Sequence, residues 1–175
     1  MNLPLPAALL DSLAGSKGYD PDAFIAVHGS GRQVTSIRIN PGKIATEEIQ
    51  RHLEPVHTEP VPWSRYGLYL SERPSFTFDP LFHAGTYYVQ EASSMFVEQA
   101  LIKACDLATS LHVLDLCAAP GGKSTHLQSL ISKESLLVSN EVIRARTNIL
   151  KDNIIKWGGG NVVVTHNDPK DFEAL

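Results

Sequence analysis

The sequence predicts an α/β protein in two parts: a small α+β domain, followed by the first half of a Rossmann-like, doubly wound parallel sheet. Two observations predict it. Downstream of residue 110, three short apolar runs alternate with two helical segments, and the connections between them are short. Upstream of residue 90, short mixed elements are separated by prolines, which forbid long helices. Strands that alternate with helices favour parallel pairing through right-handed crossovers.

The first part, residues 1–72, is expected to form the α+β domain. Asp20 can cap a helix that starts at Pro21, and Gly29-Ser30-Gly31 ends it. The alternating run 34–39 predicts a half-buried strand, and Asn40-Pro41-Gly42 turns the chain after it. The remaining expected elements are helices over 7–13 and 46–53, an edge strand over 67–70 and a connector over 73–89.

The second part, residues 90–175, is expected to carry the parallel sheet. It opens with an amphipathic helix over 90–105. Strands are expected over 112–117, 136–140 and 161–165. A helix through Leu127 and Ile131 is expected between the first two strands, and a helix over 142–157 between the last two. The sequence ends about ten residues after this third strand, so the sheet is expected to be truncated there. An unpaired apolar edge favours self-association.

Composition narrows the class of protein. The chain has 175 residues, 43% of them hydrophobic, which is enough for a buried core. Its two cysteines cannot form a disulfide framework or a cysteine-based zinc cluster, and the scattered histidines indicate no metal site. No apolar run is long enough to cross a membrane, and the N-terminus lacks the basic flank of a signal peptide, so a cytoplasmic protein is expected. The net charge of −4 argues mildly against nucleic-acid binding.

The strongest chemical signal is the loop within 115–125, where a glycine pair joins a buried strand to a helix. Such a loop lets a ligand approach the backbone, and the helix start favours an anionic group. A phosphate-cradling P-loop matches at Gly122-Lys123-Ser124, but the position of its first glycine is occupied by Cys117. A dinucleotide fingerprint fails because its glycine spacing is absent. The third alternative is S-adenosylmethionine.

Two acidic residues lie at positions suited to binding S-adenosylmethionine. Glu141 follows the second strand, about 20 residues after the loop, where a carboxylate can accept both ribose hydroxyls. Asp168 follows the third strand and could accept from an adenine amino group. Taken singly, Glu141 could instead be favoured by a helix dipole and Asp168 could belong to an ordinary turn. Their common place at the strand ends favours the cofactor interpretation.

Several segments of the sequence resemble a known protein family. The segment Asp115-Leu116-Cys117-Ala118-Ala119-Pro120-Gly121-Gly122-Lys123-Ser124-Thr125 resembles the cofactor loop of the Sun-type (NOL/NOP/Sun) RNA (cytosine-5) methyltransferases. Residues 87–95 resemble the family's segment just before the methyltransferase sheet, and residues 76–85 and, more loosely, 36–41 resemble its N-terminal portion. The resemblance covers nearly the whole chain and is nearest to bacterial enzymes that methylate small-subunit ribosomal RNA.

This resemblance implies a fold, a cofactor and a substrate. The fold is the S-adenosylmethionine-dependent methyltransferase sheet, and RNA is the implied partner, with Arg38 and Lys43 as phosphate contacts. Both could equally be solvated surface charges. The implied cofactor contacts are Cys117, Ala118, Ala119, Pro120, Gly121, Gly122, Lys123, Glu141 and Asp168.

The cysteines present do not match the nucleophile that the chemistry requires. Methylation at C5 of cytosine needs a thiolate that adds to C6. The resemblance implies that a Thr-Cys segment after the fifth strand carries it, with a second cysteine in a Pro-Cys segment after the fourth, and neither segment is present in this sequence. Cys105 and Cys117 follow alanine and leucine, so neither is assigned as catalytic. We therefore expect the parent protein to be an enzyme and this chain alone to be inactive. The alternatives are a non-catalytic module that binds S-adenosylmethionine or RNA, and a P-loop-like nucleotide binder.

Overall fold

The computed structural model describes residues 5–173, and the chain divides into two compact units, residues 1–34 and 35–175. The first unit contains two short helices, α1 (Ala7–Leu13) and α2 (Pro21–Gly29). Helix α2 begins as the sequence predicts, because a carboxylate oxygen of Asp20 accepts from the backbone N–H of Ala23 at 3.0 Å. Neither helix buries a residue among those described.

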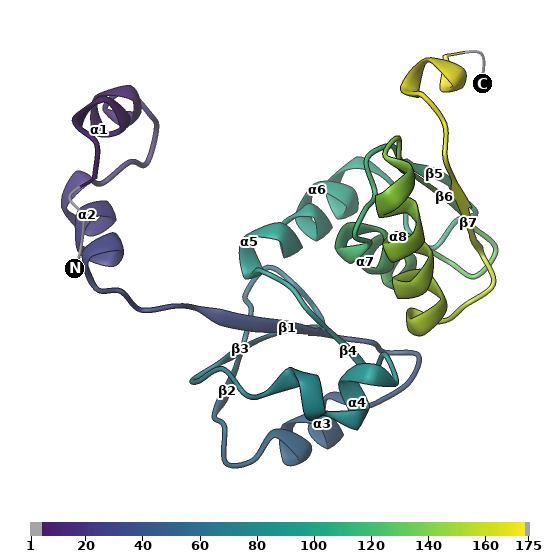
Figure 1. Cartoon of the computed structure of the whole chain (residues 1–175), viewed down its shortest axis with the longest axis horizontal. Coiled ribbons are helices and arrows are strands. Elements are labelled where there is room, and N and C mark those ends of the chain that lie inside the picture. Colours follow the sequence, from purple (N-terminus) through teal and green to yellow (C-terminus); the bar gives the residue numbers. More distant parts are fainter. Residues whose placement is uncertain (1–4, 174–175) are drawn as a thin grey trace. The chain divides into compact units, whose positions relative to one another are not determined.

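The second unit opens with an antiparallel sheet of order β2-β3-β1-β4 (Figure 1). Its strands are β1 (Thr35–Ile39), β2 (Thr58–Pro60), β3 (Gly67–Leu70) and β4 (Tyr87–Val89). The central strand β1 is buried along its whole length, and its Ile37 pairs with Leu68 on one side and Val89 on the other. Helix α3 (Thr46–Leu53) contributes Ile49 to the same core. The remaining elements are η1 (Phe76–Phe78), α4 (Pro80–His83), α5 (Ala92–Met95) and α6 (Val97–Ala104).

These boundaries differ from the expected domains in two places. Residues 1–34 form their own unit and do not join 35–72 in one domain. The segment 73–89, expected as a connector, supplies β4, whose partner β1 lies about 50 residues earlier. Such a short strand carries little periodic signal of its own, and its non-local pairing decides its structure. The single helix expected over 90–105 is divided into α5 and α6.

The parallel sheet has the order β5-β6-β7, and the predicted fold class is confirmed. Its strands are β5 (His112–Asp115), β6 (Leu136–Asn140) and β7 (Val162–Thr165), joined by α7 (Gly122–Leu130) and α8 (Arg144–Trp157), and the 3₁₀ helix η2 (Pro169–Phe172) follows. Both helices lie on one face of the sheet (Figure 1). On the other face, Leu114 and Val163 are 44% and 46% exposed as whole residues, and β5 is an edge strand.

Among residues 5–173, no helix combines the length and the apolar character that a membrane crossing needs.

Candidate functional site

The loops that follow the three parallel strands meet at one edge of the sheet, and the side chain of Asn140 joins them. Its amide nitrogen donates to the carbonyl oxygens of Leu116, at 3.2 Å, and Asn167, at 3.0 Å. Its oxygen accepts from the hydroxyl of Thr165 and the N–H of Asn167, both at 2.9 Å. Asn140 is fully buried, so its bonds form without competition from water. The strand ends are therefore held in one arrangement.

The glycine loop between β5 and α7 is built by its own backbone. The N–H of Ala118 donates to the carbonyl of Asn140 at 2.8 Å, and that of Gly121 donates back to Ala118 at 2.8 Å. Gly121 has φ of +111°, a left-handed conformation that favours glycine, and a Cβ there would lie 3.2 Å from a methyl of Leu150. The backbone conformation therefore favours glycine, and a larger residue would also require Leu150 to shift.

The start of α7 is tied back to the end of β5. The hydroxyl of Ser124 donates to the carboxylate of Asp115 at 2.6 Å. The first N–H groups of an α-helix lack intrahelical partners, and they point out of its N-terminus. The strand end and the helix start therefore present a fixed set of backbone donors at this edge, which suits an anionic group.

The predicted loop residues divide into buried and accessible ones. Ala118 and Ala119 are buried and pack against Leu150 and Ile154 of α8. Cys117 and Lys123 are exposed. The carbonyl of Pro120 accepts from Asn153 at 2.8 Å, and Gly122 begins α7. The structure therefore places all seven predicted loop residues, Cys117, Ala118, Ala119, Pro120, Gly121, Gly122 and Lys123, between β5 and the first turn of α7.

Glu141 directly follows β6 and is buried, with 3% of the residue exposed. Its Oε1 accepts from the N–H of Ile143 at 2.9 Å, and Oε2 lies 3.6 Å from the guanidinium of Arg146. The same guanidinium donates to the carbonyl of Ala119 at 2.6 Å. Arg146 thus connects Glu141 to the glycine loop, which brings two of the predicted cofactor elements together.

Asp168 lies beyond β7 and is exposed. Its Oδ1 accepts from the N–H of Lys170 at 3.0 Å, so the side chain caps η2. Its neighbour Asn167 is the residue held by Asn140. Asp168 therefore stands at the same edge of the sheet as the other predicted residues and also performs the turn-forming role of the simpler interpretation.

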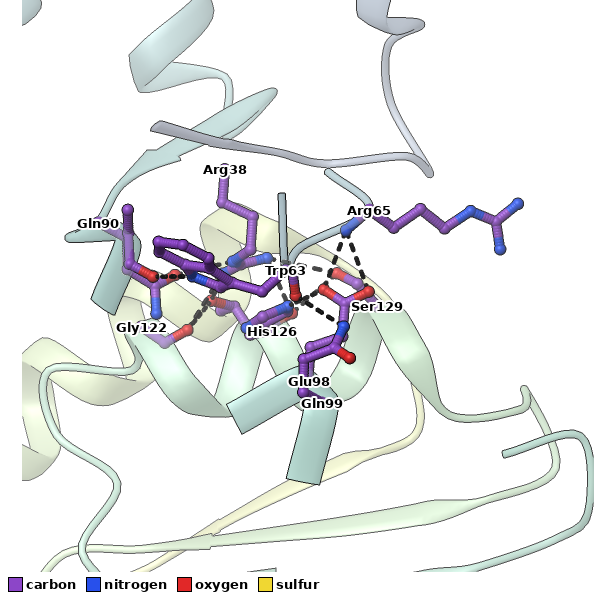
Figure 2. Close-up of polar contacts among 11 residues, drawn as sticks. Arg38, Trp63, Arg65, Gln90, Glu98, Gln99, Gly122, His126 and Ser129 are labelled. Atoms are coloured by element: carbon purple, nitrogen blue, oxygen red, sulfur yellow. Dashed lines mark hydrogen bonds and ion pairs between the residues drawn. The ribbon is translucent and has the colours of Figure 1, made fainter. Parts of the chain in front are cut away.

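The predicted phosphate contact at Arg38 does not fit the structure, because this side chain is fully buried. Its guanidinium donates to Gln90, at 2.8 Å (Figure 2), and to the hydroxyl of Thr125, at 2.6 Å. It also stacks 4.4 Å from the ring centre of Trp157. Burial lowers the pKa of Arg38 to about 9, and the group stays charged at neutral pH. The sequence shows a charged residue at this position, but only the tertiary structure shows that its side chain is buried.

Lys43 agrees better with the expectation of a surface contact, since it is exposed and lines a cleft of about 540 Å³. Its ammonium donates to the carbonyls of Ala84, at 2.7 Å, and Lys156, at 2.6 Å. A second lysine, Lys133, lines the same cleft, whose lining contains no acidic side chain among the described residues. Lys43 and Arg38 are not part of one surface.

Sequence reasoning missed a buried hydrogen-bonded pair between α6 and α7. His126, fully buried, lies 3.0 Å from the carboxylate of Glu98, which also accepts from the backbone N–H of Arg65 at 3.0 and 3.1 Å (Figure 2). Burial, together with the charge of Arg38, lowers the pKa of His126 to about 4, so the ring is neutral. Asn140 was also missed. An amide directly before Glu141 at a strand end was the only sequence signal available for it.

Within the part of the chain that the structure describes, no cluster of three or more His, Cys, Asp or Glu side chains could hold a metal ion.

The fold and the site together define a class of α/β protein. Its Rossmann-like sheet presents a glycine loop and acidic side chains at its carboxyl edge, and an antiparallel sheet precedes it in the chain. Two family models match the chain, the N-terminal domain of 16S rRNA methyltransferase RsmF over residues 5–92 and 16S rRNA methyltransferase RsmB/F over residues 103–175. The chain belongs to the RsmF family of 16S rRNA methyltransferases. Its Sun-type resemblance is thereby confirmed.

Relatives and solved structures agree with this family. The chain is 37% identical over 141 residues to ribosomal RNA small subunit methyltransferase F of Shewanella oneidensis, covering 78% of this chain and 29% of the relative. It is 34% identical over 178 residues to the enzyme of that name from Pectobacterium carotovorum, covering 97% and 36%. The chain therefore spans about a third of the length of these relatives.

Two solved structures share the fold. A methyltransferase homologue from Pyrococcus horikoshii has a TM-score of 0.74 at 27% identity, with 97% of this chain and 59% of that one covered. NSun6 from Pyrococcus horikoshii, solved with SFG, has a TM-score of 0.75 at 16% identity, covering 97% and 67%.

Proposed function

We propose that this chain is the cofactor-binding part of an RNA (cytosine-5) methyltransferase that transfers a methyl group from S-adenosylmethionine to cytosine in small-subunit ribosomal RNA in the cytoplasm. The observation that carries the proposal is the edge organised by Asn140, where the glycine loop and Glu141 lie together in a chain of the RsmF family. The P-loop alternative has no comparable support, because its first glycine is absent.

The residues at this edge suit the chemical groups of S-adenosylmethionine. The cofactor, when bound, supplies an electrophilic methyl group on a sulfonium centre. In the proposal, the backbone donors between Cys117 and Lys123, at the start of α7, would hold its carboxylate. Gly121 and Gly122 keep that approach free of bulky side chains, and NSun6, which shares the fold, was solved with SFG, an analogue of the cofactor.

The two acids are proposed to hold the nucleoside. No donor among the described residues lies within hydrogen-bonding distance of Oε2 of Glu141, so this oxygen can accept from a ribose hydroxyl. The half-exposed guanidinium of Arg146 lies beside this oxygen, at 3.6 Å. Asp168 uses one oxygen to cap η2, and the other can accept from the adenine amino group. Hydrogen bonds to charged acceptors are among the stronger ones in proteins.

RNA is proposed to contact the cleft that Lys43 and Lys133 line. Two lysines without an acidic side chain in the lining make this surface locally positive in a chain whose net charge is −4. Phosphate contacts of this kind supply affinity without reading the base sequence.

Methylation of the cytosine base requires a nucleophile, and neither cysteine of this chain is assigned that role. The thiol of Cys105 donates to the carbonyl of Leu101 on its own helix, and Cys117 belongs to the glycine loop. We propose that the catalytic thiolate lies in the remainder of the family's sequence and that this chain by itself is inactive. The alternative is that the chain binds cofactor or RNA without turnover.

Calorimetric titration of the chain with S-adenosylhomocysteine and with ATP tests the cofactor assignment. We expect the first to bind and ATP not to bind, and the reverse result contradicts the proposal. Glu141→Ala should weaken binding about 10- to 100-fold, as loss of a hydrogen bond to a charged group does. A cofactor analogue without ribose hydroxyls should bind the wild-type chain and Glu141→Ala equally. If Glu141→Ala leaves the affinity for S-adenosylhomocysteine unchanged, the ribose assignment is wrong.

The reaction is tested with a protein of the relatives' full length that contains this chain. Incubation with S-adenosylmethionine and unmodified small-subunit ribosomal RNA should produce 5-methylcytidine, measured by mass spectrometry of the digested RNA. A different methylated nucleoside contradicts the cytosine-5 assignment. Binding of both ligands with no methylated product favours the non-catalytic alternative.

A further inference from the structure

The antiparallel sheet reaches the glycine loop through one buried side chain, Arg38. This residue lies on β1, and its Nη2 donates to the carbonyl of Gly122 at 3.1 Å (Figure 2). The same nitrogen donates to the hydroxyl of Thr125 at 2.6 Å. The hydroxyl of Thr125 in turn donates to the carbonyl of Gly121 at 2.8 Å, and the carbonyl of Gly122 lies 3.2 Å from the same oxygen. Arg38 therefore holds the first turn of α7 at the residues that form the loop.

The guanidinium is itself held from two further directions. Its Nε donates to the side chain of Gln90 at 2.8 Å, and Gln90 is anchored to β1 through the hydroxyl of Ser36, which donates to its carbonyl at 2.6 Å. On its face, Arg38 lies 4.4 Å from the ring centre of Trp157 at the end of α8. A planar fork fixed in this way permits one orientation, which an ammonium group could not reproduce.

The charge of Arg38 is unusual at this place. Cations are disfavoured near a helix N-terminus, where the backbone dipoles already produce a positive potential. Among residues 5–173, no carboxylate lies within ion-pair distance of Arg38, although the buried carboxylate of Glu98 favours its charged form from farther away. A buried charge without a contacting counterion is costly, and its field is poorly screened. Arg38 therefore adds to the positive potential at the start of α7, where an anionic group of a ligand is expected.

We propose that Arg38 is a positioning residue for cofactor binding: it fixes the first turn of α7 from β1 and strengthens the positive potential there. The proposal rests on the function proposed above. It means that the antiparallel sheet, which belongs to the part matched by the RsmF N-terminal model, sets the geometry of the cofactor loop. It also explains why the segment 36–41 resembles the family's pattern although its arginine cannot contact RNA.

The test compares three variants with a matched control. Arg38→Lys keeps the charge and loses the fork, Arg38→Met loses both, and Thr125→Val removes the hydroxyl that relays the contact and changes shape little. Arg65→Lys is the control, because the Arg65 side chain is exposed and only its backbone N–H joins the buried network. The readouts are affinity for S-adenosylhomocysteine, the midpoint of urea unfolding, and amide hydrogen exchange of residues 122–126.

We expect about tenfold weaker binding for Arg38→Lys and Thr125→Val, a larger loss for Arg38→Met, and faster exchange concentrated in residues 122–126. The control should match the wild-type chain. Wild-type affinity in Arg38→Lys and Thr125→Val overturns the proposal, as does faster exchange spread evenly over both sheets, which indicates a general structural role. If the Arg38 variants do not fold, Thr125→Val decides alone. A wild-type chain that does not bind S-adenosylhomocysteine contradicts the proposed function, while hydrogen exchange still tests Arg38.

Discussion

The amide of Asn140 donates a hydrogen bond to the carbonyl oxygen of Leu116, 3.2 Å away, and so ties the end of β6 to the loop that follows β5. Because Asn140 also holds the residues after β7, one side chain organises the carboxyl edge of the whole parallel sheet. The cofactor elements lie together through this contact, although they are separated in sequence.

Replacing Asn140 with Asp should disrupt this edge. The change keeps the shape of the side chain but places a carboxylate oxygen against the carbonyls of Leu116 and Asn167, where the amide donated. Leaving buried groups unsatisfied costs about 1–3 kcal/mol each, so urea unfolding should show a loss of at least that size, and S-adenosylhomocysteine should bind more weakly. Asn148→Asp, on the exposed surface of α8, is the control. Equal stability of the two variants would contradict the organising role.

Gly121 should tolerate no side chain. Gly121→Ala forces a left-handed φ of +111° on an L residue and brings its Cβ to 3.2 Å from Leu150, so we expect a loss of about 1–3 kcal/mol and weaker cofactor binding. Gly160→Ala is the matched control, since nothing lies within 4 Å of the Cβ it would add. Calorimetric titration and thermal unfolding measure both effects. A Gly121→Ala chain that binds normally would rule out a strict backbone requirement.

The buried pair of His126 and Glu98 predicts a pH dependence of stability. The pKa of His126 is lowered to about 4 in the folded chain, mainly by burial, against about 6.5 when unfolded. Below pH 6.5 the unfolded chain therefore binds more protons, and folding stability falls as the pH drops from about 6.5 to about 4. Above pH 6.5 this residue contributes no pH dependence.

Urea unfolding at pH 7.5, 6, 5 and 4 measures this effect. His126→Gln can still donate to Glu98 and does not titrate, so its stability should fall less than that of the wild-type chain over this range. His57→Gln, which removes an exposed histidine paired with Glu59, should follow the wild-type chain. Parallel pH profiles for the wild-type chain and His126→Gln would show that His126 is not responsible.

The lysine cleft predicts salt-dependent RNA binding. Lys133→Ala should weaken binding of a single-stranded RNA and lower the slope of log K against log salt by about 0.7, as expected when one phosphate contact is lost. Lys103→Ala removes an equal charge from exposed α6, away from the cleft lining, and is the control. Fluorescence anisotropy across a salt series gives both slopes. An equal decrease in both variants would indicate a general charge effect and no RNA site at the cleft.

The exposed face and edge of the parallel sheet predict self-association of the isolated chain. Leu114 and Val163 are 44% and 46% exposed on the face that α7 and α8 leave uncovered, and β5 has an unpaired edge. Exposed apolar surface and unpaired strand edges favour association. Light scattering over a concentration series should show a mass that rises with concentration, and Leu114→Lys should reduce it. A monodisperse monomer at all concentrations contradicts the prediction.

Local sequence patterns determined the parallel part of the fold. Strand β6 matches its predicted bounds, 136–140, because the apolar run that begins at Leu136 favours a buried strand and the flanking turns end it. The place of the glycine loop and of Glu141 follows from the same logic, since parallel strands end at one edge. These features depend on residues close together in the chain.

Tertiary structure decided the role of each polar side chain. Arg38 alternates with apolar residues on a strand that reads as half-buried, yet β3, β4 and α7 enclose it on all sides. Likewise, β4 exists through its pairing with β1, and Asn140 gains its role from loops that lie about 25 residues away on either side. Periodicity reports which side of an element faces a core, but the partner that covers the other side is set by contacts between distant segments.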